Sequence, residues 1–264
     1  MREAEQPSTI RMNRGILVAF EGIDGAGKTT QALRLKERLE AAGLETVLSK
    51  EPTSGPHGTR IRQSAMTGRL EATDELRILL DDRRQHVAEL IVPSIEAGKV
   101  VIIDRYYFST AAYQGARGFD PDSLLALNED FAPAPDLLVL LDISVDTALE
   151  RIRLRGDGNG NLFERKDTLE TCAEIFGRLE RPFLLRLDGT QAPDQIHQRI
   201  VAALDVGPLF RNICHKTYLT ACEPADCSYR IQHQCDYPYL GVLREPPSVR
   251  AETLNAIASD SNRN

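Results

Sequence analysis

The sequence predicts an α/β fold in which a parallel β-sheet is covered by helices on both faces. Two observations predict this class. Short apolar runs alternate along the chain with segments of helical periodicity, and the runs themselves are continuously apolar rather than alternately polar. Strands of that kind are typical of parallel sheets that are buried between two layers of helices. The composition agrees, because 42% of the 264 residues are hydrophobic, which is enough for a sizeable core.

Five apolar runs are the predicted strands, and they cover residues 15–21, 44–50, 99–104, 136–143 and 184–187. After the first run, Ala32, Leu35 and Leu39 recur at helical spacing, and Gly43 is suited to end that helix. Residues 51–58 hold two prolines and two glycines and are expected to form a loop. We expect a long helix over 74–97 with a kink or break at Pro93, and a closing helix over 193–204.

Composition also bounds the function and the domain organisation. The formal net charge is −7, which argues against binding to nucleic acid. No apolar run is long enough to span a membrane, and no secretory signal opens the chain, so we expect a cytoplasmic protein with reduced cysteines. The expected organisation is a disordered lead-in (1–14), one catalytic domain (15–204), a cysteine-rich extension (205–245) and a disordered tail (246–264).

Residues 22–29, GIDGAGKT, match the phosphate-binding pattern G-x-x-x-x-G-K-[ST] in full. The motif follows a predicted strand and opens a predicted helix, which is the context that it requires. Glycines let the backbone aim its N–H groups at phosphate oxygens, and Lys28 can bridge the β- and γ-phosphates. The predicted triphosphate site consists of Gly22, Ile23, Asp24, Gly25, Ala26, Gly27, Lys28, Thr29 and Thr30.

Two further features indicate a phosphoryl-transfer enzyme. Asp104 ends the third predicted strand, so its carboxylate and the Thr29 hydroxyl are expected to hold Mg²⁺. The glycine-rich segment 156–160 has Arg153, Arg155 and Arg165 around it, which is typical of a mobile lid that brings cations onto the transferring phosphoryl group. A guanine-reading GTPase is the competing class, but the chain has no N-K-x-D signature.

Five segments in this order resemble the thymidylate kinase family. They are FEGIDGAGKTTQ (20–31), KEPTSG (50–55), DDRRQHV (81–87), DRYYFSTAAYQG (104–115) and LFERKDTLE (162–170). The resemblance covers residues 15–204. It implies a P-loop NTPase-type fold with a helical lid, phosphoryl transfer from ATP to dTMP giving dTDP and ADP, a requirement for Mg²⁺, and a homodimer.

The resemblance also implies a role for individual positions. Asp24 would contact the 3′-hydroxyl of the acceptor sugar, Arg62 and Arg105 would hold its phosphate, and Arg83 and Thr110 would read the base edge. Tyr113 would favour a deoxyribose, and Gln114 would lie beside the base. The implied acceptor site is therefore Asp24, Glu51, Arg62, Leu79, Arg83, Arg105, Thr110, Tyr113 and Gln114.

The implied catalytic residues are Lys28, Arg105 and three lid arginines, Arg153, Arg155 and Arg165. Glu164 belongs to the same lid. Gly25 occupies a loop position where some relatives place an arginine, and members with glycine there resemble the bacterial type, in which the lid supplies the catalytic arginines.

The chain departs from the family pattern at two positions. Leu79 stands where the family usually has an aromatic residue that stacks on thymine, which removes about 1 kcal/mol of stacking. The alternative role for Leu79 is that of a core leucine in a stripe with Leu76, Leu80 and Val87. Leu162 stands where relatives commonly carry a lid arginine.

Four of the five cysteines, Cys214, Cys222, Cys227 and Cys235, fall after the region of resemblance. Their spacing is symmetric but lacks the C-x₂-C pair of the usual zinc type. Four thiolates could bind Zn²⁺ or an iron–sulfur cluster, His215 and His233 offer alternative ligands, and buried free thiols or disulfides are the other possibilities. The functional alternatives are a nucleoside-monophosphate kinase with a different base preference, and a non-enzymatic sensor that only binds nucleotide.

Overall fold

The computed structural model describes residues 12–156, 162–209 and 212. Its centre is a five-stranded sheet in the order β2-β3-β1-β4-β5, in which every neighbouring pair is parallel. The strands are β1 (Ile16–Glu21), β2 (Thr46–Lys50), β3 (Val100–Asp104), β4 (Leu137–Asp142) and β5 (Leu184–Asp188). The prediction of a parallel sheet with five strands in these places is confirmed.

Burial follows the position of each strand in the sheet. All six residues of β1 are buried, as are the first four residues of β3 and the first five of β4, whereas the edge strand β2 is half-buried along most of its length. The central strands are covered on both faces, which accounts for their continuous apolar sequence.

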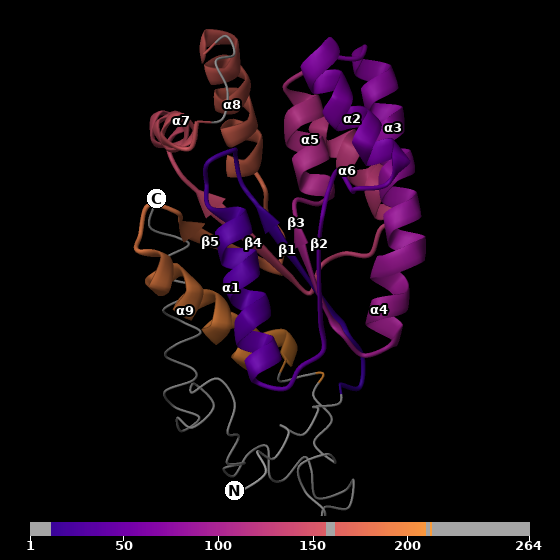
Figure 1. The fold of residues 1–264 in the computed structure, drawn as a ribbon, viewed down its shortest axis with the longest axis vertical. Coiled ribbons are helices and arrows are strands. Elements are labelled where there is room, and N and C mark those ends of the chain that lie inside the picture. The colour runs from indigo at the N-terminus through magenta and orange to yellow at the C-terminus, as the bar shows by residue number, and fades with distance from the viewer. Residues whose placement is uncertain (1–11, 157–161, 210–211, 213–264) are drawn as a thin grey trace, which may run out of the picture.

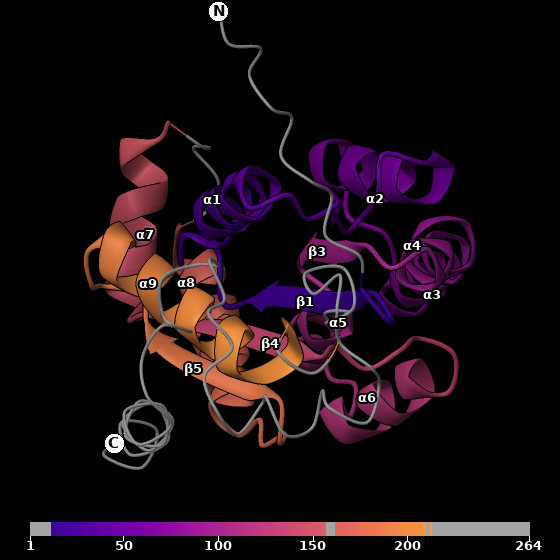
Figure 2. The same cartoon turned by 90° about the horizontal axis from the view of Figure 1, so that it is seen from below.

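Helices cover both faces of the sheet. α1 (Lys28–Ala41) and α9 (Pro193–Leu204) lie together on one face, joined by a hydrogen bond from Gln31 Nε2 to the Pro193 carbonyl (2.9 Å). The other face carries α4 (Val92–Glu96), α5 (Tyr107–Gly115) and α6 (Pro121–Glu129), as the view in Figure 2 shows. α1 ends as predicted, because Gly43 has a φ of 85° and donates to the Glu40 carbonyl.

Two helical predictions need correction. The expected loop over 51–58 is shorter, because α2 (Pro56–Thr67) already begins at Pro56, and proline suits the first turn of a helix. The expected long helix over 74–97 is instead three consecutive segments, α3 (Ala72–His86), the π-helical turn η1 (Val87–Ile91) and α4. The irregularity therefore precedes Pro93, which lies in the first turn of α4.

The remaining helices are α7 (Val145–Leu154), α8 (Leu162–Gly177) and the π-helical turn η2 (Asp205–Leu209). Figure 1 shows α7 and α8 on one side of the upper end of the sheet and α2, α3 and α5 on the other. The residues between α7 and α8 lie outside the described part of the chain.

Residues 12–14 are not part of a disordered lead-in as the sequence predicts. Met12 packs against the core, Arg14 pairs with Asp136, and the Asn13 N–H donates to the Asn212 carbonyl (2.6 Å). These contacts lie at the amino end of β1, the edge of the sheet opposite to the glycine-rich loop.

Candidate active site

The glycine-rich loop joins β1 to α1 at the carboxyl edge of the sheet, where ligands bind in folds of this kind. Gly25 in this loop has a φ of 90°, and a Cβ there would lie 2.7 Å from the carbonyl oxygen of Ala148 on α7. This close approach and the positive φ account for glycine at position 25.

Lys28 is buried at the start of α1 and turns back onto its own loop. Its Nζ donates to the carbonyl oxygens of Gly22 and Ile23, both at 2.9 Å. Burial and the nearby Arg105 guanidinium lower the pKa of Lys28 to about 7. The amine therefore lies inside the loop, where a phosphate group would stabilise its charged form.

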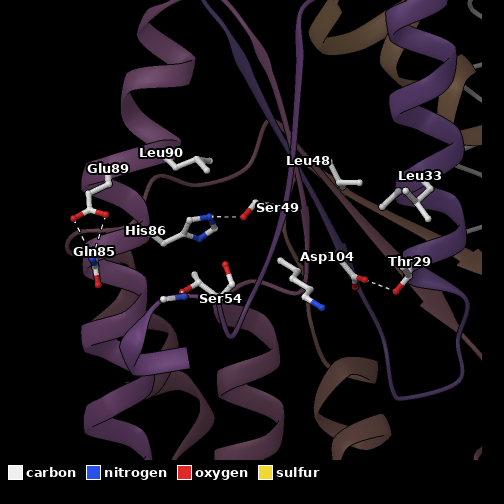
Figure 3. Close-up of a pocket in the computed structure, with 14 residues that line it drawn as sticks. Thr29, Leu33, Leu48, Ser49, Ser54, Gln85, His86, Glu89, Leu90 and Asp104 are labelled. Atoms are coloured by element: carbon white, nitrogen blue, oxygen red, sulfur yellow. Dashed lines mark hydrogen bonds between the residues drawn. The ribbon is translucent and has the colours of Figure 1, made fainter. Parts of the chain in front are cut away.

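Thr29 and Asp104 lie together at the mouth of the loop. The Thr29 hydroxyl donates to the Asp104 carboxylate at the end of β3 (Figure 3). A hydroxyl and a carboxylate in contact beside a phosphate loop are the oxygen ligands that Mg²⁺ takes in nucleotide sites, so these residues fit the ion that the sequence implies.

A cavity of about 220 Å³ joins the predicted triphosphate residues to predicted acceptor and lid residues. Its lining comes from the loop, the ends of β2 and β3, and the end of α7. The lining residues are Asp24, Gly25, Gly27, Lys28, Thr29, Thr30, Lys50, Glu51, Asp104, Arg105 and Arg155. The structure thus brings Lys28, Arg105 and Arg155 together, although they lie far apart in the sequence.

Arg105 has a left-handed backbone conformation (φ 71°) just after β3. Its guanidinium pairs with Asp24, donates to Ser109 Oγ (3.0 Å) and lies over the Tyr113 ring, 5.0 Å from its centroid. Burial alone would lower the pKa of Arg105, but Tyr113 and Asp24 raise it above its ordinary value, so Arg105 is a permanent cation. Burial raises the pKa of Tyr113 to about 12, and its hydroxyl accepts from the Asp24 N–H (3.2 Å).

Glu21 is a buried residue of the site to which the sequence argument gave no role. It is fully buried at the end of β1, and its carboxylate accepts from the N–H groups of Tyr106 (2.7 Å) and Ser109 (3.0 Å) and from Ser109 Oγ (2.5 Å). Burial raises its pKa, although Ser109 and Arg105 oppose that shift. Glu21 therefore holds the start of α5 and the serine that contacts Arg105.

Arg83 on α3 is the centre of a buried polar network. It is 2% exposed. Its Nε and one terminal nitrogen donate to the same Glu51 oxygen (2.8 and 2.5 Å), and it also donates to Thr110 Oγ1 (3.0 Å) and Asn128 Oδ1 (2.6 Å). Burial would raise the pKa of Glu51, but the Arg83 charge and a hydrogen bond from His86 lower it, so Glu51 is a carboxylate. Three of the predicted acceptor residues are therefore in direct contact.

Gln114 lies one turn after Thr110 on the same face of α5. Its Nε2 donates to Glu75 (2.7 Å), which also pairs with Arg69 and Arg117. Within the described part of the chain, the buried Gln114 Oε1 has no hydrogen-bond partner. A buried acceptor of this kind needs a donor, which a ligand could supply.

Two predicted acceptor residues lie less deeply. Leu79 is half-buried, between the buried Ile78 and Leu80, so its place beside the acceptor base stays a prediction. Arg62 is exposed on α2 and donates to the carbonyl oxygens of Pro52 (2.8 Å) and Thr53 (2.6 Å). Arg62 thus supports the loop after β2, and its contact with an acceptor phosphate stays a prediction.

The lid is partly described. Arg153 and Arg155 are exposed at the end of α7, whereas the side chains of Leu162, Glu164 and Arg165 lie outside the described residues. Arg151, which the sequence argument did not single out, donates to the carbonyl oxygens of Gly25 (3.4 Å) and Gly189 (3.0 Å). Arg151 therefore connects α7 to the glycine-rich loop. The sequence alone does not indicate this contact, because Arg151 is one of several arginines close together in the chain.

Cys214, Cys222, Cys227 and Cys235 lie outside the described residues, so their predicted metal site is not addressed by the structure. In the part of the chain that is described, no cluster of three or more histidine, cysteine or acidic side chains is arranged to hold a metal ion. Among the helices of that same part, none is long and apolar enough to cross a membrane.

Comparison with known proteins identifies the family. The model of the Thymidylate kinase family matches residues 20–200. Thymidylate kinases from Xanthomonas campestris pv. campestris (strain B100) and Xanthomonas oryzae pv. oryzae (strain PXO99A) are each 55% identical to this chain over 194 residues, which are 72% of this chain and 85% of the relative. The thymidylate kinase of Akkermansia muciniphila is 46% identical over 193 residues, 73% of this chain and 93% of the relative. With the phosphate loop, the parallel sheet and the acceptor network in place, the chain belongs to the thymidylate kinase family.

Proposed function

We propose that this chain transfers the γ-phosphoryl group of ATP to dTMP in the 220 Å³ cavity, and that the acceptor base lies toward Arg83, which contacts Glu51 of the cavity lining. The observation that carries the proposal is the cavity itself, because the phosphate loop and the cations Arg105 and Arg155 line it together. The family supports the activity, and it does not favour a kinase with another base preference or a non-enzymatic sensor.

The reaction is an in-line displacement. An oxygen of the dTMP phosphate forms a bond to the γ-phosphorus while the bond from that phosphorus to the β,γ-bridging oxygen breaks, and ADP leaves. The acceptor phosphate is already ionised at neutral pH, so the chain has to supply position and positive charge rather than a strong base. Lys28 and the loop amides hold the ATP phosphates, and Arg105 holds the acceptor phosphate.

Thr29 and Asp104 would hold the Mg²⁺ that the family implies. When bound, that ion supplies neutralisation of the charge on the ATP phosphates. Arg155 lines the same cavity from α7, and Arg153 lies two residues before it. These two residues, with Arg165, are the proposed lid cations for the transferring group.

Arg83 and Gln114 are the groups proposed to read the acceptor base. Both already make hydrogen bonds within the protein. The contacts among the described residues use four of the five N–H groups of Arg83, which leaves one donor for a carbonyl oxygen of the base. Gln114 Oε1 offers an acceptor. Thymine presents a carbonyl oxygen beside an N–H group, whereas cytosine presents the reverse polarity, so this pair of groups favours thymine.

A coupled assay of ADP release with ATP and each of dTMP, dUMP, dCMP and dGMP tests the proposal. We expect dTMP to be the preferred acceptor and dCMP to be a poor one. Equal rates with all four acceptors would remove the basis for the proposed base reading, and no turnover with any of them would contradict the proposed function.

Three further assignments rest on the sequence and the family resemblance. We infer that the protein is a homodimer, which light scattering of the purified protein would test, and that it is cytoplasmic, which fractionation of cells would test. The cysteines after residue 213 stay candidates for Zn²⁺ or an iron–sulfur cluster. Elemental analysis of untagged protein would separate these metals from free thiols or disulfides.

A further inference from the structure

A chain of hydrogen bonds connects the edge strand to the proposed acceptor site. Ser49 Oγ on β2 lies 2.8 Å from His86 Nε2, and His86 Nδ1 lies 2.9 Å from Glu51 Oε1. The other Glu51 oxygen receives Arg83. Figure 3 shows the first contact, and both His86 and Ser49 line a second cavity of about 590 Å³.

The identity of Glu51 fixes the proton on His86. Glu51 is an ionised carboxylate, which accepts hydrogen bonds and donates none. His86 Nδ1 must therefore carry a proton in order to make the 2.9 Å contact. In the neutral imidazole Nε2 then accepts from the Ser49 hydroxyl, so both ring nitrogens have a suitable partner.

His86 and Arg83 divide the two oxygens of Glu51 between them. Arg83 holds Oε2 from one side and His86 holds Oε1 from the other, and both side chains are at least nine-tenths buried. Without the donor from His86, Oε1 would be a buried charged oxygen with a lost partner, and the carboxylate could turn about its Cγ–Cδ bond. Arg83 would then lose one of the contacts that fix its orientation, because Glu51 receives two of its N–H groups.

We propose that His86 is a positioning residue for the acceptor base, acting through Glu51 on Arg83. The inference rests on the proposed dTMP kinase activity and deepens it. It assigns His86 to recognition of the acceptor, and it predicts no role for this side chain in ATP binding, because its contacts run to Glu51 and Ser49 rather than to the phosphate loop.

The test compares His86→Asn with His86→Leu in the full-length protein. Asparagine can keep an N–H donor near the position of Nδ1, whereas leucine fills space and donates nothing. We expect His86→Leu to raise the KM for dTMP about tenfold and to reduce the preference for dTMP over dCMP, with the KM for ATP unchanged. We expect His86→Asn to restore most of the affinity for dTMP.

Gln85→Leu is the matched control, because Gln85 precedes His86, lines the same cavity and bonds only to Glu89 among the contacts described. It should leave both KM values at the wild-type level. An unchanged KM for dTMP in His86→Leu, an equal rise in both KM values, or a failure of asparagine to rescue would overturn the proposal.

Nitrogen-15 NMR of histidine-labelled wild-type protein gives a test that does not depend on the folding of a variant. Protonation at His86 Nδ1 is expected, and an unprotonated Nδ1 overturns the proposal. Wild-type kinetics separate this inference from the proposed function: absent dTMP turnover in the wild type counts against the function, whereas normal turnover with an unaffected His86→Leu counts against the inference alone.

Discussion

The acceptor side and the ATP side of the cavity are built differently. On the acceptor side, Arg83 is buried and held by Glu51, Thr110 and Asn128, so its guanidinium already has one orientation. On the ATP side, Lys28 donates to carbonyl oxygens of its own loop. On the proposed acceptor side, protein groups therefore orient the guanidinium, whereas on the proposed ATP side phosphate oxygens would replace backbone carbonyls as partners of the amine.

The two sides therefore differ in how far their protein contacts have to change when a ligand binds. A preorganised site loses little rotational freedom when it binds, and it discriminates through the direction of its donors and acceptors. At the proposed ATP site, binding depends on how well the negative charge of the ligand replaces the contacts that Lys28 makes with its own loop. We therefore expect substitutions on the acceptor side to alter selectivity, and those on the ATP side to alter turnover and the response to pH.

The largest expected effect is that of Lys28→Ala. Removing the amine that is proposed to contact the ATP phosphates should lower kcat by at least about 10³-fold, because its positive charge in the loop would be lost. The KM for dTMP should change little. Steady-state kinetics with circular dichroism as a folding control would check this, and a near-normal kcat would contradict the role of the loop.

Arg105→Lys should have the next largest effect. Lysine keeps the charge but cannot reproduce the simultaneous contacts to Asp24, Ser109 and the Tyr113 ring. We expect kcat/KM for dTMP to fall about 10²-fold. Calorimetry with ATP alone provides the control. An equal loss of ATP affinity would show that Arg105 acts on the binding of ATP rather than on that of the acceptor.

The pH dependence of ATP binding sharpens the comparison further. The pKa of Lys28 is lowered to about 7, so in the ligand-free protein the amine is mostly uncharged at pH 8. Phosphate favours the charged amine, so binding takes up a proton, and ATP affinity should fall by up to about tenfold per pH unit above 7. Calorimetry in buffers of different ionisation enthalpy measures that uptake, and its absence at pH 8 would contradict the lowered pKa.

The smallest expected effect is that of Leu79→Phe. The half-buried leucine lies one helical turn before Arg83, and an aromatic ring there could stack on the base. Stacking of about 1 kcal/mol would lower the KM for dTMP about fivefold. The KM for ATP serves as the internal control. A rise in the KM for dTMP would show that the acceptor side has no room for the ring.

The parts of the site that could be predicted from the sequence are those whose determinants are local. The phosphate loop lies within eight consecutive residues, and the strands appear as apolar runs. Glu21, Arg151 and His86 could not be assigned in this way. Glu21 acts on Ser109, 88 positions later in the chain, and His86 acts on Glu51, 35 positions earlier. Only the fold brings such pairs together.

Arg62 illustrates the same limit from the other direction. The sequence places an arginine after the second strand, but it could not show that α2 begins at Pro56 and that Arg62 then faces the carbonyl oxygens of Pro52 and Thr53. The length of a loop decides where a long side chain points, and that length was overestimated over residues 51–58.

The hydrogen bond between Asn13 and Asn212 has a practical consequence for handling the enzyme. Both residues lie at the amino edge of the sheet, and the six-residue strand β1 separates them from the nucleotide loop by about 20 Å. A fluorophore attached to the side chain at either position would therefore lie at the edge of the sheet opposite to the proposed substrate cavity.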